Sequence, residues 1–323
     1  MKVCIFGAGA VGGHLAAKLA RGGLDVSVVA RGPHLRAIQD DGLTLTSPKE
    51  TFNVRVRATD NPAELGVQDL VITALKAHSL PAAADGIGQL LDADTPVVFA
   101  ANGVPWWYFY GAGGEFDGRP LPRLDPDGVL ARRIGLHRVI GAVIRSPNEV
   151  VRPGVIEARA ENNALVLGEL DGAITERLTR YCETLSAHFG AVTPTSDIRT
   201  AVWDKLLVNV VTSPMACLAL ATSKDIADDP DLVALYRKLA QECIAIAARL
   251  GITLKPDIET LLRRGREFAH KPSMLQDLLA GRPLEIDAQL LAVQDIARLV
   301  GVDTPLMDAL FALLKVRARQ HGD

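Results

Sequence analysis

Three polar side chains recur at intervals of four residues in a mostly apolar stretch: Lys205, Asn209 and Ser213. On a helix, residues four apart lie about one turn from each other on the same face. Because the flanking residues are mostly leucine and valine, we expect this helix to be buried. Burial lowers the pKa of a lysine toward the range useful for proton transfer, which makes Lys205 a candidate general acid. The alternative is a structural lysine that reaches solvent or forms an ion pair.

A second candidate site lies at the start of the chain. Gly7, Gly9 and Gly12 form the pattern G-x-G-x-x-G between an apolar run, 3–6, and a helical pattern that includes Leu15. In this pattern the first glycine permits a tight turn, the second lets a pyrophosphate approach the backbone, and the third lets the helix pack on the strand. The start of the helix also favours an anion. We therefore predict a dinucleotide site at Gly7, Ala8, Gly9, Ala10, Val11 and Gly12.

The residue after the second predicted strand, 25–30, bears on which dinucleotide is bound. An NAD enzyme usually carries Asp or Glu there, to bind the ribose 2′-hydroxyl. This chain carries Arg31, whose guanidinium suits a 2′-phosphate. We expect NADP as the cofactor; the alternative is that Arg31 is an ordinary solvated loop charge.

Strands that alternate with helices must position these residues. Further apolar runs at 69–75 and 96–100 are separated by a helical stretch. This alternation predicts an α/β fold with a Rossmann-type doubly wound parallel sheet, in which ligands bind beyond the carboxyl ends of the strands. Lys76 and Asn102 follow these two runs, so we expect both beside the cofactor.

The pattern after the first sheet strands predicts two domains. We expect an exposed hairpin at 43–45 and 52–56, short antiparallel strands that complete the sheet at 139–144, 149–152, 155–158 and 164–167, and a helix at 174–189. Beyond residue 197 the pattern is helical, at 200–213 (ended by Pro214), 232–250, 257–268, 274–279, 284–300 and 305–319. The predicted domains are an NADP-binding domain, 1–195, and an all-helical substrate and catalytic domain, 196–323.

Five aromatic residues, at 106–110, open a Gly-, Pro- and Asp-rich loop that runs to Asp127. Long loops in compact enzymes often act as lids, so this one could shape the choice of substrate. Alternatively, the aromatic side chains cover a sheet edge or a subunit contact.

Composition excludes several classes of protein. The chain has 323 residues, 48% hydrophobic and 23% charged, and a net charge of −3. It shows no apolar run long enough to span a bilayer, no basic run for nucleic acid and no signal-peptide pattern before the first strand. Its scattered cysteines form no C-x-x-C pair and are expected to be reduced core thiols of a cytoplasmic protein. We predict no metal site, and the sequence leaves open whether the protein forms a homodimer.

Two short segments, 273–277 and 285–287, bracket a turn at 281–283. Taken alone, they are typical of helix capping and surface charge, and Ser273 is placed as an N-cap for the helix that follows.

Taken together, these motifs resemble the ketopantoate reductase family, the NADPH-dependent 2-dehydropantoate 2-reductases, over nearly the whole chain. The similar segments are 7–12, Ala74-Leu75-Lys76, Asn102-Gly103, Trp203-Asp204-Lys205-Leu206-Leu207-Val208-Asn209, and Ser273 to Asp277 with Glu285 to Asp287.

The resemblance implies a role for each matched residue. Arg31 and Lys76 would bind the region of the 2′-phosphate, and Asn102 would contact cofactor and substrate. Lys205 would be the general acid in the reduction of a 2-oxo acid. Asn209, Ser213 and Ser273 would hold the substrate, and Glu285 would contact the substrate and the nicotinamide ribose.

Two departures from the family pattern leave the substrate open. Ser213 stands where the family usually has a further asparagine, and the loop that ends at Asp127 is longer than usual. A related 2-oxo acid or a β-dicarbonyl is therefore an alternative substrate. The rival functions are a 3-hydroxy acid dehydrogenase with a helical second domain and a non-catalytic NADP-sensing protein.

Overall fold

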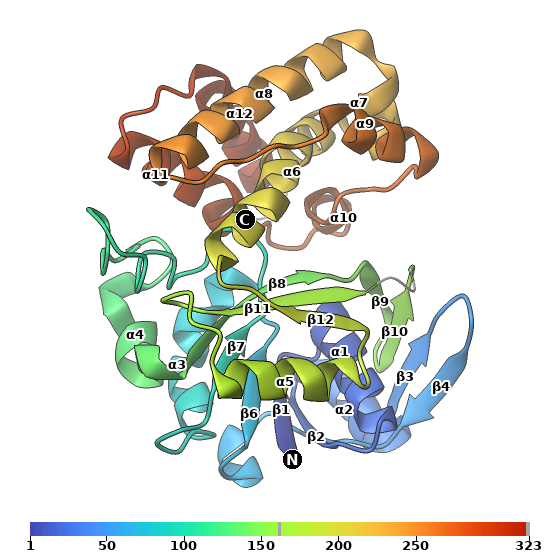
Figure 1. The fold of residues 1–323 in the computed structure, drawn as a ribbon. Helices are drawn as coiled ribbons and strands as arrows, with labels where there is room; N and C mark the ends of the chain where they lie inside the picture. The colour runs from blue at the N-terminus through green and yellow to red at the C-terminus, as the bar shows by residue number, and fades with distance from the viewer. Residues whose placement is uncertain (161–162, 321–323) are drawn as a thin grey trace. The chain divides into compact units, whose positions relative to one another are not determined.

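The computed structural model describes residues 1–160 and 163–320. The chain forms two compact units, Met1–Ile198 and Arg199–Asp323 (Figure 1). The division lies a few residues after the expected one at 195/196.

The first unit is built on an eight-stranded sheet with the order β12-β11-β8-β7-β6-β1-β2-β5. Its strands are β1 Lys2–Phe6, β2 Asp25–Val29, β5 Arg57–Thr59, β6 Leu70–Thr73, β7 Val97–Phe99, β8 Val139–Arg145, β11 Ala164–Glu169 and β12 Ala191–Pro194. Neighbouring strands from β8 through β7, β6, β1 and β2 to β5 pair parallel, and β11 pairs antiparallel with β8. The predicted Rossmann-type parallel sheet is therefore confirmed. The expectation that the strand at 139–144 is antiparallel is wrong for its pairing with β7, because β8 continues the parallel sheet and only β11 reverses direction. β5 and β12 were not predicted from the sequence.

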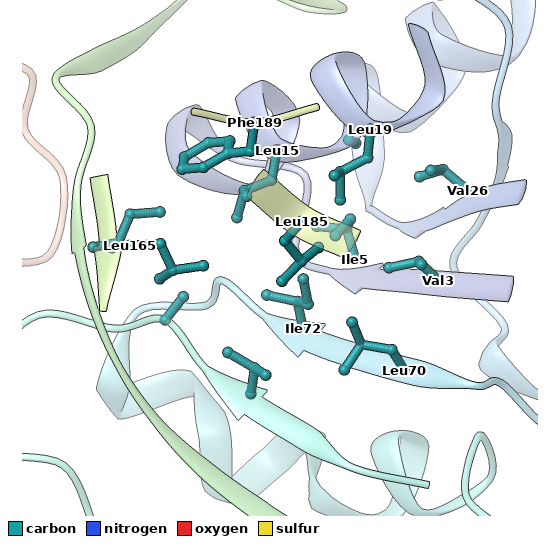
Figure 2. Packing of buried hydrophobic residues seen from close by; sticks show 14 of the residues in the cluster. Val3, Ile5, Leu15, Leu19, Val26, Leu70, Ile72, Leu165, Leu185 and Phe189 are labelled. Carbon is teal, nitrogen blue, oxygen red and sulfur yellow. The ribbon is translucent and has the colours of Figure 1, made fainter. Parts of the chain in front are cut away.

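Helices cover both faces of this sheet, which explains why its central strands are apolar without alternation. Val3 and Ile5 of β1 pack with Leu15 and Leu19 of one helix and with Leu185 of another (Figure 2). On the opposite face, the Phe6 ring lies against Gly86. The helices of this unit are α1 Ala10–Arg21, α2 Gly32–Asp41, α3 Leu80–Gly88, α4 Val129–Ile134 and α5 Glu176–Ser186, with short helices η1 Pro62–Leu65, η2 Ala77–Ser79, η3 Pro126–Gly128 and η4 Leu136–Arg138.

A separate four-stranded sheet, β4-β3-β10-β9, corrects two expectations. Its strands are β3 Leu43–Thr46, β4 Thr51–Val54, β9 Asn148–Arg152 and β10 Val155–Ala158. β3 and β4 form the predicted hairpin, but β3 is not exposed, because Leu43 and Leu45 are fully buried. β9 and β10 do not complete the main sheet, since β10 pairs parallel with β3. A two-residue period shows which face of a strand is buried but not which sheet the strand joins.

The aromatic segment at 106–110 belongs to the core of the first unit. Trp106, Trp107, Tyr108 and Phe109 are at most 2% exposed. Trp106 contacts Phe99 of β7 edge to face, with the ring centroids 5.4 Å apart. These four side chains therefore pack against the sheet, which is closest to the second interpretation. A role of the rest of the loop, up to Asp127, in substrate choice stays a prediction.

The second unit is helical, as expected. Its helices are α6 Ile198–Ala219, α7 Ser223–Asp228, α8 Pro230–Arg249, α9 Ile258–Glu267, α10 Ser273–Leu279, the π-helical η5 Asp287–Leu291, α11 Ala292–Leu299 and α12 Pro305–Gln320. No helix in the described part of the chain is long and apolar enough to cross a membrane. The four cysteines are buried and form no disulfide.

Two helix boundaries differ from the sequence prediction. α6 does not end at Pro214 but continues to Ala219. Pro214 has no N–H for the Val210 carbonyl, but the buried Val211 and Met215 hold the helix on both sides of it. The helix expected from Leu284 begins at Ile286 and makes a π-helical turn before α11.

Candidate functional site

The glycine loop between β1 and α1 is fixed by close backbone contacts. Gly7 has φ 102°, and its N–H donates to the Val29 carbonyl at 2.9 Å. A Cβ on Gly7 would lie 2.7 Å from Leu75 Cδ2, and a Cβ on Gly12 would lie 1.9 Å from the Gly7 oxygen. Any larger residue at these two positions would push the loop, the helix or the segment after β6 apart. The first and third glycines therefore have the structural roles that the motif predicts.

The start of α1 is open at Gly9, in contrast to the close contacts at Gly7 and Gly12. Gly9 is the N-cap, with φ −65° and ψ −162°, and no side chain caps the helix. A Cβ on Gly9 would meet nothing within 4 Å. The first turn carries no acidic residue, so the N–H groups and the helix dipole together favour an anion. This is the arrangement that a dinucleotide pyrophosphate requires.

The parallel register brings the other predicted cofactor residues to the same edge of the sheet. β7, β6, β1 and β2 are neighbours, and Phe6 is aligned with Val29 on one side and with Thr73 on the other. Arg31 follows β2 as the N-cap of α2 and is exposed. Lys76 and Asn102 follow β6 and β7 and are half-buried. These three residues and the glycine loop therefore lie beyond adjacent strand ends.

Sequence reasoning missed His34, which contacts the glycine loop directly. Its Nε2 lies 2.7 Å from the Ala8 carbonyl oxygen, and its Nδ1 accepts from the Gly154 N–H at 3.1 Å. Burial lowers the pKa of His34, against the opposing effect of the bond to Ala8. A signal was present in the sequence, because the histidine follows Arg31 in the first turn of a helix that begins at the cofactor edge.

In the second unit, Lys205 and Asn209 share a face of α6. Both are half-buried, whereas Leu206, Leu207 and Val210 around them are at most 2% exposed. Ser213 continues the row one turn farther and is 2% exposed. The expectation of a largely buried helix is met, and the lysine on it is half-buried.

Ser273 does not cap α10. It is the first residue of the helix, the N-cap is Pro272, and no side chain makes a capping bond. Ser273 is exposed, so the capping interpretation of this serine is wrong. The polar residue with a structural task in this segment is Asp277, whose carboxylate accepts from Arg282 Nε at 2.8 Å and closes the turn after α10.

Glu285 lies two residues before the π-helical turn. It is 9% exposed, and its Oε2 accepts a hydrogen bond from Nε2 of Gln289 at 3.2 Å. Gln289 is 1% exposed, and its side-chain oxygen, Oε1, has no hydrogen-bond partner among the described residues. π-Helical turns are rare, and those that occur lie frequently at functional sites. Gln289 was also missed from the sequence, although it stands four residues after Glu285 on a predicted helix.

The predicted residues thus form two groups, one in each unit. The first comprises the glycine loop, Arg31, Lys76 and Asn102; the second comprises Lys205, Asn209, Ser213, Ser273 and Glu285. Within the described ranges, no three His, Cys, Asp or Glu side chains gather in a way that could hold a metal ion.

Known proteins match this chain in both units. The family described as Ketopantoate reductase PanE/ApbA matches residues 3–114, and its C-terminal part matches residues 197–318. A 2-dehydropantoate 2-reductase of Mesorhizobium japonicum is 45% identical over 100% of this chain and 99% of its own.

Solved structures match over the full length as well. A protein from Ralstonia solanacearum MolK2, assigned as a ketopantoate reductase, has a TM-score of 0.92 and 39% identity over 99% of this chain and 98% of its own. The 2-dehydropantoate 2-reductase from Geobacter metallireducens GS-15 has a TM-score of 0.86 and 26% identity over 98% and 99% of the two chains. D-mandelate dehydrogenase with NADH and anilino(oxo)acetate has a TM-score of 0.85 at 19% identity, covers 100% of both chains and shows the shared fold. This chain therefore belongs to the ketopantoate reductase family.

Proposed function

We propose that the protein reduces ketopantoate to pantoate with NADPH. The first unit binds the dinucleotide, and the second supplies the residues that hold the substrate and donate a proton. The full-length similarity to a 2-dehydropantoate 2-reductase of Mesorhizobium japonicum supports this substrate. Ser213, where the family pattern has asparagine, keeps a related 2-oxo acid or a β-dicarbonyl as the second candidate.

The residues at the edge of the first sheet fit a dinucleotide. The open N-terminus of α1 suits the pyrophosphate, because a phosphate can approach Gly9 without meeting a side chain. Arg31 and Lys76 would hold the 2′-phosphate, and Asn102 would lie toward the nicotinamide. The D-mandelate dehydrogenase structure is described with NADH. The arginine at the end of β2 favours NADPH for this chain.

The second unit fits the proton chemistry of ketone reduction. Bound NADPH supplies the hydride that the ketone carbon accepts. Lys205 stabilises the negative charge that develops on the ketone oxygen and donates the proton that completes the hydroxyl group. Asn209, Ser213 and Ser273 are hydrogen-bonding groups for the substrate. The carboxylate of Glu285, held by Gln289, accepts from a hydroxyl of the substrate or of the ribose.

One observation carries this proposal. A half-buried lysine and a half-buried asparagine share one face of a largely apolar helix, in a chain whose first unit has an open glycine loop. A protein that only senses NADP would need the loop but not Lys205.

The test is NADPH oxidation with ketopantoate, followed by a panel of other 2-oxo acids and β-dicarbonyls. Oxidation of 3-hydroxy acids by NADP⁺ is measured in parallel. We expect the highest kcat/KM with ketopantoate. A higher kcat/KM with a 3-hydroxy acid would identify the dehydrogenase alternative. NADPH binding without turnover of any substrate would identify a sensing protein.

A further inference from the structure

The His34 ring lies between two backbone segments that are far apart in the sequence. Its Nε2 is 2.7 Å from the Ala8 oxygen in the glycine loop. Its Nδ1 is 3.1 Å from the backbone nitrogen of Gly154, in the turn between β9 and β10. The two bonds use both polar atoms of the side chain. The imidazole therefore links the glycine loop, α2 and the smaller sheet within the first unit.

The two partners fix the state of the ring. A backbone N–H can only donate and a carbonyl oxygen can only accept, so Nδ1 is unprotonated and Nε2 carries the hydrogen. His34 is thus neutral, and burial lowers its pKa from the ordinary value, which preserves the neutral form near pH 7. The ring acts as a donor toward Ala8 and as an acceptor toward Gly154.

The bond to Ala8 orients the peptide unit that joins Ala8 to Gly9. In a trans peptide the carbonyl and the following N–H point in opposite directions in one plane. Holding the Ala8 oxygen toward His34 therefore fixes the direction of the Gly9 N–H. Gly9 is the exposed N-cap of α1, and a Cβ there would meet no atom within 4 Å. This N–H belongs to the part of the loop that a pyrophosphate approaches.

The other end of the link is well anchored. Gly154 has φ 75°, and a Cβ there would lie 3.1 Å from the Cβ of Ala37 in α2. Its carbonyl accepts from the Thr44 N–H of β3 at 2.9 Å. The turn is therefore held by β3 and packed on α2, so it gives the imidazole a fixed support. Glycines have wide conformational freedom, and a loop that contains three of them gains order from such a support.

We propose that His34 is a positioning residue that holds the Ala8–Gly9 peptide in the orientation that binds the dinucleotide pyrophosphate. The inference rests on the proposed binding of a dinucleotide, but it does not depend on the identity of the substrate. Any nicotinamide dinucleotide is affected, because the pyrophosphate is common to NADPH and NADH.

The test uses three variants of the full-length protein. H34L removes both bonds. H34Q places an amide N–H where Nε2 was, so it keeps the donor to Ala8 and loses the acceptor for Gly154. H34N places an oxygen near the Nδ1 position, so it keeps the acceptor and loses the donor. Q39L is the matched control, because the exposed Gln39 on the same helix donates to the Ala58 carbonyl of β5 at 2.9 Å rather than to the glycine loop.

Binding of NADPH and NADH is measured directly by fluorescence titration, and hydrogen exchange of the 7–12 segment is measured without cofactor. We expect H34L and H34N to weaken both dinucleotides by about five- to thirtyfold and to exchange faster in this segment. H34Q should stay within about threefold of the original protein. In the steady state, KM for NADPH should rise while kcat at saturation is retained.

A structural role alone predicts a different pattern. Unchanged dinucleotide affinity in H34L and H34N, with a loss of Tm like that of Q39L, would overturn the proposal, as would equal losses in H34Q and H34N. If H34L does not fold, the comparison of H34Q with H34N decides. Original protein that binds neither dinucleotide would also overturn it. Binding without reduction of ketopantoate would defeat only the proposed substrate.

Discussion

The glycine loop of the first unit and the polar face of α6 in the second differ in how their geometry is set. The loop is set by the backbone: positive φ at Gly7, and no room for a Cβ at Gly12. Its parts lie within six consecutive residues, 7–12. The α6 face is set by side chains, Lys205 and Asn209, and its proposed companions Ser273 and Glu285 come from other segments. A substitution in the loop should therefore change dinucleotide affinity by altering the backbone shape of the loop. A substitution on α6 should change the rate of the chemical step and leave the backbone unchanged.

The largest expected effect tests the chemistry of α6. Lys205→Ala should lower kcat by about 10²–10⁴-fold, the usual contribution of a positioned proton donor. NADPH affinity and Tm should change little, because the proposed dinucleotide site lies in the first unit. Lys205→Arg should restore little, since a guanidinium does not release its proton near neutral pH.

Lys224→Ala is the matched control for Lys205. Lys224 forms an exposed ion pair with Asp228 on α7, and such pairs contribute little to stability. Its activity should equal that of the original protein. A Lys205→Ala enzyme with kcat within a fewfold of the original, where chemistry limits the rate, would make Lys205 a structural lysine.

A pair of glycine substitutions separates shape from binding in the loop. Gly9→Ala should weaken NADPH by about a hundredfold, because the methyl group displaces charge-assisted hydrogen bonds to phosphate. Its Tm should fall only slightly, since a Cβ there meets no protein atom within 4 Å and φ is −65°. Gly12→Ala should lower stability by about 1–3 kcal/mol, because its Cβ would clash with the Gly7 oxygen. Titration and thermal unfolding measure the two effects; an equal loss of Tm in both variants would contradict the distinction.

The third expected effect distinguishes phosphate recognition from loop geometry. Arg31→Ala should weaken NADPH by roughly ten- to a hundredfold and leave NADH nearly unchanged, because only NADPH carries the 2′-phosphate. Arg36→Ala, at an exposed position of the same helix, is the control and should change neither affinity. Equal losses for both dinucleotides in a titration of Arg31→Ala would show that this arginine does not bind the phosphate.

The smallest expected effect concerns the carboxylate that Gln289 holds. Gln289→Met keeps the buried volume but removes the donor to Glu285. We expect kcat/KM for ketopantoate to fall by about tenfold, with NADPH affinity unchanged. The control is Gln294→Met, which removes the hydrogen bond from α11 to Asp308 on α12. It should lower Tm and leave kcat/KM unchanged; the same fall in kcat/KM in both variants would argue against a role for Gln289 in the site.

The sequence allowed most of the first unit to be predicted, because its signals are local. An apolar run followed by G-x-G-x-x-G specifies strand, turn and helix together, and the parallel sheet then places Arg31, Lys76 and Asn102 at one edge. The sheet that β9 and β10 join was not predictable, because it depends on the pairing of β10 with β3, which is far away in the sequence. His34 was missed for the same reason, because its two bonds span 26 and 120 residues.

The errors in the second unit have a different cause, which is that tertiary packing overrides local rules. Pro214 is a strong helix terminator by local chemistry, yet α6 continues through it among buried neighbours. The period of a regular helix gave no sign of the π-helical turn at Asp287–Leu291. Ser273 has the residue type of an N-cap, but Pro272 occupies that position. The approximate ranges of α8, α9, α10 and α12 were predictable, whereas the short helix α7, the full length of α6, the caps and the irregular turn were not.

The parallel pairing of β3 with β10 determines when the dinucleotide loop can be completed during synthesis. Residues 7–12 leave the ribosome early, but their support through His34 requires Gly154, 120 residues later. Until then β3 has only β4 as a partner, and the edge that β10 will occupy is open to pairing with another nascent chain. Until residues 154–158 have left the ribosome, the chain is therefore an aggregation-prone intermediate whose glycine loop is present but not yet fixed.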